Sequence, residues 1–276
     1  MKRFARSVLP LLCATLLATP AGLEATWSVI AVDRSSGQVV IASATCVSQE
    51  ALRGFPSGGL MDIQAVVVPG RGVAAAQAGV DRSRENQNLI RRGLAEGWDP
   101  ARILDELRSD PEVERRQFAI VDLEGRTATF SGAENGEASL AAAGEVPGGD
   151  IHFSVQGNIL ASDAVVHAGV QAFLEATGDR LTDRVMAAME AADAAGGDRR
   201  CTCETEPLPR TQCNGRTSHV AYILAADPGD PAGPGHSEGE WSLFIDVTDE
   251  NIRPDENANP VITLRQRYDA WRAGEG

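Results

Sequence analysis

The residue with the clearest capacity for chemistry is Thr26, which directly follows Ala25 where an apparent export signal gives way to the first strand pattern. A threonine at a chain terminus carries its own general base, because an α-amine has a pKa of about 7.7–8.0. That amine can take the hydroxyl proton directly or through one water molecule. Cleavage after Ala25 would therefore make Thr26 a candidate nucleophile. The alternative is that Thr26 merely opens a strand, as threonine often does.

Residues 1–25 have the pattern of a secretory signal, with a basic head, an apolar stretch and small residues before the cleavage point. We expect a protein exported to the periplasm or the exterior, with one domain over residues 26–276. No later apolar run is long enough to cross a bilayer. A second cleavage point after Ala21 also has small residues in the required places and would leave Gly22 as the first residue.

The charge balance excludes several classes of function. The chain has 25 basic and 39 acidic residues, a net charge of −14; removing Lys2, Arg3, Arg6 and Glu24 with the signal leaves 22 and 38, a net charge of −16. Such a surface repels nucleic acid and anionic membranes. No lysine follows Lys2, so Schiff-base and serine–lysine chemistry are excluded. Phosphate-loop, dinucleotide and metalloprotease signatures are absent, and no cofactor is expected.

Four cysteines follow the signal, and an even number in an exported chain favours disulfides. They are Cys46, Cys201, Cys203 and Cys213. Cys201 and Cys203 are too close in sequence to pair without strain, so one is expected to bond to Cys213 and the other to Cys46. The three later cysteines lie in a loop at 200–216 without apolar periodicity. The rival interpretation is a zinc site formed by these three and His219, although the spacing matches no recognised zinc motif.

The order of elements indicates an α+β fold. Strand patterns cover 26–33, 38–46, 62–68, 72–80, 116–132 as a hairpin, and 152–158, with two more at 218–226 and 240–247. Leu89, Ile90 and Leu94 fall on one face of an expected helix, and further helices are expected after Asp99, Ser162 and Asn259 and from Leu181. The stretch 51–60 and the acidic segment before Asp150 read as loops. Because hairpins dominate over parallel crossovers, we expect antiparallel sheets with helices on their outer faces.

Five segments resemble, in order, the motifs of an uncharacterised bacterial family with an N-terminal nucleophile (Ntn) hydrolase-like fold. The segments are TWSVIAVDRSSGQVVIASAT, AVVVPGRGVAAAQAGVD, RQFAIVDLEGR, FSVQGNIL and AADAAGGDRR. The resemblance implies a four-layer αββα sandwich, with the nucleophile at the start of the first strand. Family members typically begin with Met followed by Thr or Ser, so signal cleavage here would expose the matching residue, Thr26.

The same resemblance implies which residues meet Thr26 at that end of the fold. The matching positions are Ser43, Gln77, Gln156, Asn158, Asp198, Arg199 and Arg200. Asn158 could donate a hydrogen bond to an oxyanion, and Arg199 could bind a substrate carboxylate. Asp198 could orient the Thr26 amine or Arg199. The alternatives are that Asn158 makes a turn and that Asp198 and Arg199 form a structural ion pair. One departure from the family pattern is Asp81, where asparagine is common.

Two functions fit these features. In the first, the protein is an exported amidohydrolase whose Thr26 attacks an amide or related acyl group of a small-molecule or peptide-like substrate. In the second, the same fold is a non-catalytic binding or structural module, because a fold alone does not confer activity. The sequence leaves open a homo-oligomer and names no substrate.

Overall fold

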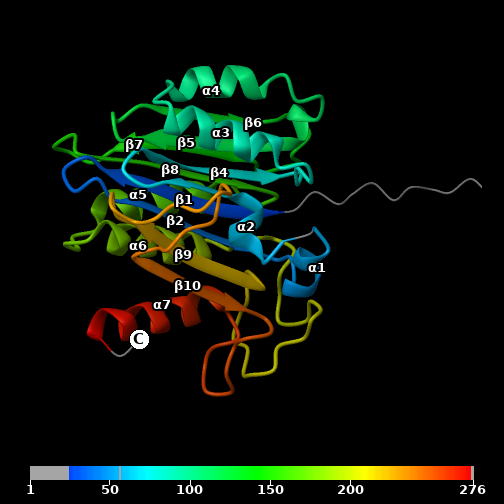
Figure 1. Cartoon of the computed structure of the whole chain (residues 1–276). Helices are drawn as coiled ribbons and strands as arrows, with labels where there is room; N and C mark the ends of the chain where they lie inside the picture. The colour runs from blue at the N-terminus through cyan, green and yellow to red at the C-terminus, as the bar shows by residue number, and fades with distance from the viewer. Residues whose placement is uncertain (1–24, 56, 275–276) are drawn as a thin grey trace, which may run out of the picture.

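Two antiparallel sheets of unequal size form the centre of the computed structural model, which describes residues 25–55 and 57–274 (Figure 1). The six-stranded sheet has the order β10(Leu243–Thr248), β9(Val220–Ala226), β2(Val39–Thr45), β1(Thr26–Asp33), β8(Ile151–Asn158), β7(Leu140–Glu145). The four-stranded sheet has the order β3(Ala65–Val68), β4(Gly72–Ala78), β5(Arg116–Asp122), β6(Thr127–Ser131). The chain therefore has an α+β fold.

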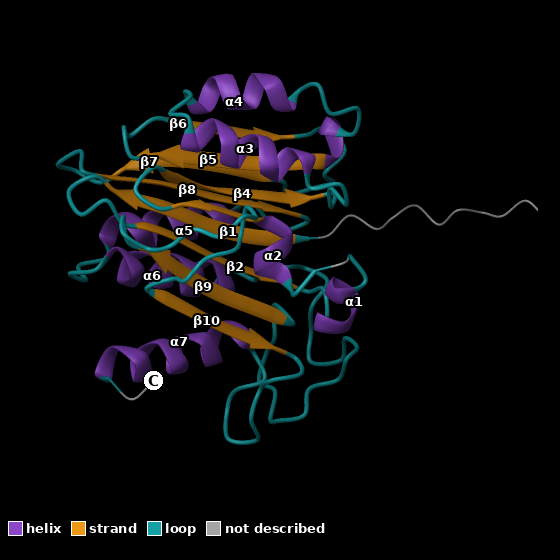
Figure 2. Cartoon of the chain, in the orientation of Figure 1, coloured by secondary structure: helices purple, strands orange, loops and turns teal. Residues whose placement is uncertain are grey.

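Seven α-helices occur in the described residues, together with one short 3-10 turn (Figure 2). They are α1(Gln49–Arg53), α2(Leu60–Gln64), α3(Glu85–Ala95), α4(Pro100–Leu107), α5(Ala164–Glu175), α6(Leu181–Ala194) and α7(Pro260–Ala273), with η1(Val113–Arg115) before β5. Asp99 and Asn259 cap α4 and α7 through their side chains, and a proline opens each of these helices. The two helix starts expected from these pairs are confirmed. None of the described helices is both long and apolar enough to cross a membrane.

Apolar side chains fill three spaces that separate the elements into layers. One cluster lies between the two sheets, a second lies between the larger sheet and α5, α6 and α7, and a third lies between the smaller sheet and α3 and α4. Figure 1 shows α3 and α4 on one outer side and α5 to α7 on the other. Each sheet therefore has a helical cover on its outer face, as the sequence indicated.

Strand β1 is central because it pairs with β2 on one side and β8 on the other. Its side chains alternate between faces: Trp27 and Val29 face the helices, whereas Ile30 and Val32 face the smaller sheet. Thr26 and Ser28 share the second face by the same alternation. The period-2 pattern thus directs the first residue of β1 into the space between the sheets.

Three expectations from sequence are wrong at this level. The stretch 51–60 was expected as a loop, but residues 51–53 belong to α1 and Leu60 is the first residue of α2. Residues 62–64 were expected in a strand, but they form the last part of α2, and β3 begins only at Ala65. The acidic segment before Asp150 was expected as a loop, but it contains the edge strand β7. That strand consists mostly of alanine and glycine, which have low strand propensity, and it is stabilised by pairing with β8.

Packing against the larger sheet predicts a clear stability difference between neighbouring residues of α5. Phe173 is fully buried and stacks on Phe153 with ring centroids 4.1 Å apart, whereas Leu174 is 39% exposed. Phe173→Ala should lower the free energy of unfolding by about 3–5 kcal/mol. Leu174→Ala, the matched control, should cost under about 1 kcal/mol. Urea unfolding followed by circular dichroism measures both values, and equal losses would contradict the packing described here.

Candidate active site

Polar side chains gather between the sheets around the start of β1. Thr26 is 3% exposed, and its register partners are Thr45 on β2 and Asn158 on β8. Thr26 Oγ1 lies 3.3 Å from Thr45 Oγ1. The next position on this face is Ser28, whose register partners are Ser43 and Gln156. These six residues are all buried. The structure therefore brings together Thr26 and three of the residues expected beside it, Ser43, Gln156 and Asn158.

Glutamines tie this polar group to the smaller sheet. Gln77 Nε2 on β4 donates to the Thr26 carbonyl at 3.0 Å and to Gln117 Oε1 at 2.8 Å. The Ser28 hydroxyl donates to Gln77 Oε1. Gln117 Nε2 donates to the Gly157 carbonyl at 2.9 Å, and Gln156 Nε2 donates across the gap to Ala75 at 3.2 Å. Hydrogen bonds thus join the two sheets at the end where Thr26 lies.

The carbonyl of Ala25, immediately before Thr26, has two donors. Thr45 Oγ1 donates to it at 2.6 Å and Arg200 Nη2 at 3.1 Å. Ala25 itself is fully buried. The peptide group that would have to be cut to release the Thr26 amine is therefore held by a hydroxyl and a guanidinium inside the fold.

Asp198 positions the guanidinium of Arg200. Asp198 is fully buried, and its carboxylate lies 2.7 Å from Arg200 Nη2. The same carboxylate accepts from the backbone N–H of Cys46 at 2.9 Å. Arg199, by contrast, has a side chain 45% exposed that pairs with Glu137 at 3.3 Å. The ion pair of Asp198 is therefore with Arg200, and Arg199 does not join the group around Thr26.

A small cavity adjoins Thr26. Its volume is about 20 Å³, and its polar lining residues are Thr26, Thr45, Gln64 and Gln77. The rest of the lining is apolar and includes Leu60 of α2. A space of this size holds about one water molecule. The amide Nε2 of Gln64 is buried and lacks a hydrogen-bond partner among the described residues.

Two strands end at this site in unusual backbone conformations. Ala78 directly follows Gln77 and has a φ of 70°, and Ile159 directly follows Asn158 and has a φ of 52°. Both lie in the left-handed region, which non-glycine residues seldom adopt. Ile, a β-branched residue, is especially disfavoured there. Such conformations concentrate at functional sites.

The four cysteines form two disulfides, Cys46–Cys201 and Cys203–Cys213. This is one of the two pairings that the sequence left open. Ligand atoms of Cys46, Cys201 and His219 lie within 4.8 Å of one another, but the two sulfur atoms are bonded together rather than available as thiolates. The arrangement supports a covalent clamp between the end of β2 and the loop at 200–216, in place of the zinc alternative. Figure 1 shows this loop, α1 and α2 at the same end as the start of β1.

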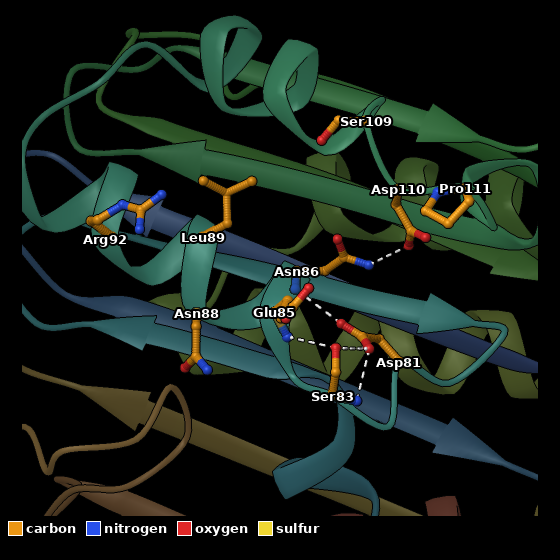
Figure 3. Close-up of a pocket in the computed structure, with 10 residues that line it drawn as sticks. All are labelled: Asp81, Ser83, Glu85, Asn86, Asn88, Leu89, Arg92, Ser109, Asp110 and Pro111. Atoms are coloured by element: carbon orange, nitrogen blue, oxygen red, sulfur yellow. Dashed lines mark hydrogen bonds between the residues drawn. The ribbon is translucent and has the colours of Figure 1, made fainter.

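A larger pocket, about 410 Å³, lies elsewhere, at the start of α3 (Figure 3). It shares no lining residue with the Thr26 cavity. Asp81 accepts hydrogen bonds from Ser83 and from the N–H of Asn86, and Asp110 accepts from Asn86 and Arg116. Burial raises the pKa of Asp81, but these hydrogen bonds outweigh it and hold that pKa below its usual value. The carboxylates of Asp81 and Asp110 both accept hydrogen bonds from Asn86 and therefore hold the first turn of α3 in place.

Several members of the site were missed from sequence: Ser28, Thr45, Gln64, Gln117 and the Ala25 carbonyl. The period-2 alternation of β1 and β2 offers a signal for Ser28 and Thr45, since each lies on the same strand face as an expected residue. Gln117 is the second residue of β5, a strand otherwise rich in apolar residues. No local pattern marks Gln64, because its position depends on α2, which the sequence did not indicate.

The fold and the site together define a class of α+β protein with a buried polar site between two antiparallel sheets. The site includes the first residue of a central strand, Thr26. Comparison with known proteins is more specific. Residues 26–205 match the family of unknown function DUF1028, and the chain belongs to this family. No curated protein matches the chain.

A solved structure supports the same architecture. The crystal structure of protein SPO2555 from Silicibacter pomeroyi, assigned to DUF1028, is similar to this chain with a TM-score of 0.63. The two sequences are 22% identical, and the similarity covers 91% of this chain and 90% of that chain. At this identity the likeness concerns the fold alone.

The two disulfides close loops of very different length and should therefore differ in their contribution to stability. Cys46 and Cys201 are 155 residues apart, whereas Cys203 and Cys213 are 10 apart. In the chain-entropy description, replacing the first pair with alanine should cost about 4–5 kcal/mol and replacing the second about 2–3 kcal/mol. Thermal and urea unfolding of the two double variants measure the difference. A larger loss from the Cys203–Cys213 pair would show that the Cys46–Cys201 disulfide is not the more stabilising of the two.

His219 predicts a specific pH dependence of stability. Burial, with the nearby cations Arg216 and Arg200, lowers its pKa to about 4 from an ordinary value of 6.5. Between these values the unfolded chain takes up a proton that the folded chain does not, so stability falls as the pH falls from about 6.5 to about 4.

The expected loss over that window is on the order of 2–3 kcal/mol, and His219→Gln should remove it. His167→Gln is the matched control, because His167 is exposed on α5, and it should leave the pH dependence unchanged. Urea unfolding at a series of pH values tests this; parallel curves for wild type and His219→Gln would contradict it.

Proposed function

We propose that the protein is an exported Ntn-type amidohydrolase in which Thr26, once its α-amine is free, attacks an amide or related acyl group. The observation that carries the proposal is the set of groups around the Ala25–Thr26 peptide. A hydroxyl and a guanidinium donate to the Ala25 carbonyl, and Thr26 Oγ1 lies beside them in a buried site. The family match, which begins at Thr26, is consistent with the proposal.

The layer order supports the finer assignment of the fold. Helices, sheet, sheet and helices follow one another, as in the four-layer αββα sandwich of Ntn hydrolases, and Thr26 opens a central strand. In that arrangement the nucleophile sits at an end of the sandwich.

The chemistry would begin with proton transfer from Thr26 Oγ1 to the Thr26 amine. Burial disfavours the charged ammonium form, so the amine remains available as a base. Oγ1 then bonds to the acyl carbon, the carbon–nitrogen bond of the amide breaks, and the leaving amine takes the proton. Water subsequently attacks the Thr26 ester, releasing the acid and restoring the hydroxyl. The cavity beside Thr26 has room for about one water molecule.

Thr45 and Arg200 are the proposed oxyanion donors. Removal of Ala25 takes away the carbonyl that now accepts from both, and the carbonyl oxygen of a substrate would take its place. Asp198 acts as a positioning residue by pairing with Arg200. Gln77 orients the start of β1 through the Thr26 carbonyl. Asn158, in register with Thr26, is a further candidate donor.

The proposed cellular setting follows from the sequence and the cysteines. A leading export signal and two disulfides fit an oxidising compartment outside the cytoplasm. The strongly acidic chain favours a small-molecule or peptide-like substrate over nucleic acid or an anionic membrane.

One observation favours the second candidate, a non-catalytic module. The cavity at Thr26, about 20 Å³, is too small to hold a substrate acyl group while α2 keeps its present position. Catalysis therefore requires removal of the preceding residues, displacement of Leu60, or both. A binding module requires neither.

Substitution of Thr26 tests the enzyme. In the processed protein, Thr26→Ala should reduce turnover of a responsive amide by at least about a thousandfold, and Thr26→Ser should retain part of it. Thr127→Ala, at an exposed position on β6, is the matched control and should leave turnover unchanged. A panel of small amides and acyl-amino acids supplies the assay.

The N-terminus is determined on the same samples by intact mass. A protein that turns over substrate while its first residue is Gly22, or a Thr26→Ala variant with wild-type turnover, would exclude Thr26 as the nucleophile. Correct processing to Thr26 with no turnover across the panel would favour the binding module.

A further inference from the structure

The unequal sizes of the sheets leave part of the larger sheet without a partner strand. Strand β4 packs on β1 and β2, and β5 packs on β1 and β8. Strand β9 lies beyond this overlap, and α2 packs on it instead. Between the α2 segment and the strands β9 and β10 a pocket of about 170 Å³ remains. This volume is large enough for a small organic group but not for a macromolecule.

The chemistry of the pocket walls is aromatic and acidic. Tyr222 and Phe244 lie on its strand side, with ring centroids 6.4 Å apart and planes tilted by 50°. Asp246 on β10 and Asp62 on α2 contribute two carboxylates. Among the described residues that line the pocket, none is lysine, arginine or histidine. Aromatic faces and carboxylates attract a positively charged group.

The two carboxylates differ in how far the protein already uses them. Asp62 accepts from Ser237 Oγ at 2.8 Å and from the Gly58 N–H at 3.1 Å. The Asp246 carboxylate has a contact of 3.5 Å with Asn251 Nδ2 and forms no ion pair with the described residues, and Arg267 of α7 donates at 2.7 Å to the Asp246 backbone carbonyl instead. Asp246 is therefore the carboxylate with more capacity to pair with a cation from outside the chain.

A buried hydroxyl also lacks a partner at this pocket. Tyr222 is 1% exposed, and its hydroxyl makes no hydrogen bond with the part of the chain that the structure describes. Leaving such a group unpaired costs about 1–3 kcal/mol, so a polar atom on a bound molecule would stabilise it. Phe244, on the neighbouring strand, is instead 44% exposed, so its ring is accessible to a bound molecule.

We propose that this pocket binds a small organic cation, an ammonium group on an apolar body, between the carboxylates of Asp246 and Asp62 and the rings of Tyr222 and Phe244. A bare metal ion is a poorer occupant, because the two carboxylates belong to no cluster of three or more metal-ligating side chains in residues 25–55 and 57–274. An anion would meet two carboxylates and no cation in the lining.

The pocket also adjoins the site described above, since Leu60 lines both it and the Thr26 cavity. On the proposed function, this shared wall makes the pocket the place for the cationic end of the amide substrate, remote from the bond that breaks. Binding of a cation to the pocket does not itself require Thr26 to be catalytic.

Calorimetric titration of the full chain carrying Thr26→Ala tests the pocket without turnover, at an ionic strength of about 0.15 M to screen general attraction. The probes are 2-phenylethylamine, the uncharged 2-phenylethanol and the anionic 3-phenylpropanoate. The amine should bind saturably at one site, and the other two should bind at least about tenfold more weakly. Asp246→Asn should weaken amine binding about tenfold, and Phe244→Leu about fivefold.

Asp105→Asn is the matched control, because it removes the same charge from an exposed side chain on α4. It should leave the affinity for the amine unchanged. Equal binding of amine and alcohol would overturn the selection for a cation. An affinity unchanged by Asp246→Asn and Phe244→Leu, or lowered equally by Asp105→Asn, would overturn the assignment to this pocket.

The two proposals fail separately. Amine binding in a protein whose wild-type form turns over no amide counts against Thr26 alone. Turnover without amine binding counts against the pocket alone. Thermal unfolding of each variant, with transitions within a few degrees of wild type, ensures that a lost affinity reflects lost contacts.

Discussion

Burying polar side chains between two sheets is the constraint on which this structure depends. The face of β1 that meets the smaller sheet is polar at Thr26 and Ser28 and apolar from Ile30 onwards. An unpaired polar group in such a place is costly, so the opposing strands must supply donors and acceptors there. Gln77 and Gln117 supply them from the smaller sheet. Because these bonds reach particular backbone carbonyls, they also fix how one sheet sits on the other.

Two local signals made much of the fold predictable from sequence: the alternation of apolar residues along strands and the capping residues at helix starts. The strands that open the chain and the helices that follow Asp99-Pro100 and Asn259-Pro260 have strong local signals, and the structure has them. Strand β7 was missed because its small residues have no strand preference of their own and acquire order only from β8. Helix α2 was missed because its five residues owe their helical form to the gap that they fill between β2, β9 and β4.

The candidate site was predictable to a similar degree. Residues on paired strands, such as Ser43 and Gln156, converge on Thr26 because register fixes their neighbours. Residues in loops were harder to place. In the segment Asp198-Arg199-Arg200, either arginine could have paired with the carboxylate. The chain direction after the Gly196-Gly197 turn points Arg200 inward, toward the Ala25 carbonyl, whereas Arg199 pairs with Glu137. Sequence spacing alone does not contain that direction.

The burial of Ala25 turns access to Thr26 into a question of timing. In the folded chain the peptide bond between Ala25 and Thr26 is buried, and the Ala25 carbonyl accepts hydrogen bonds from Thr45 and Arg200. A peptidase needs an extended and exposed segment, so on the proposed export and processing the cut falls before β1 pairs with its neighbours. After folding, the same cut requires local opening of a central strand, which draws on much of the stability of the whole domain. On the proposed processing, the order of folding and cleavage thereby decides which chains carry a free threonine.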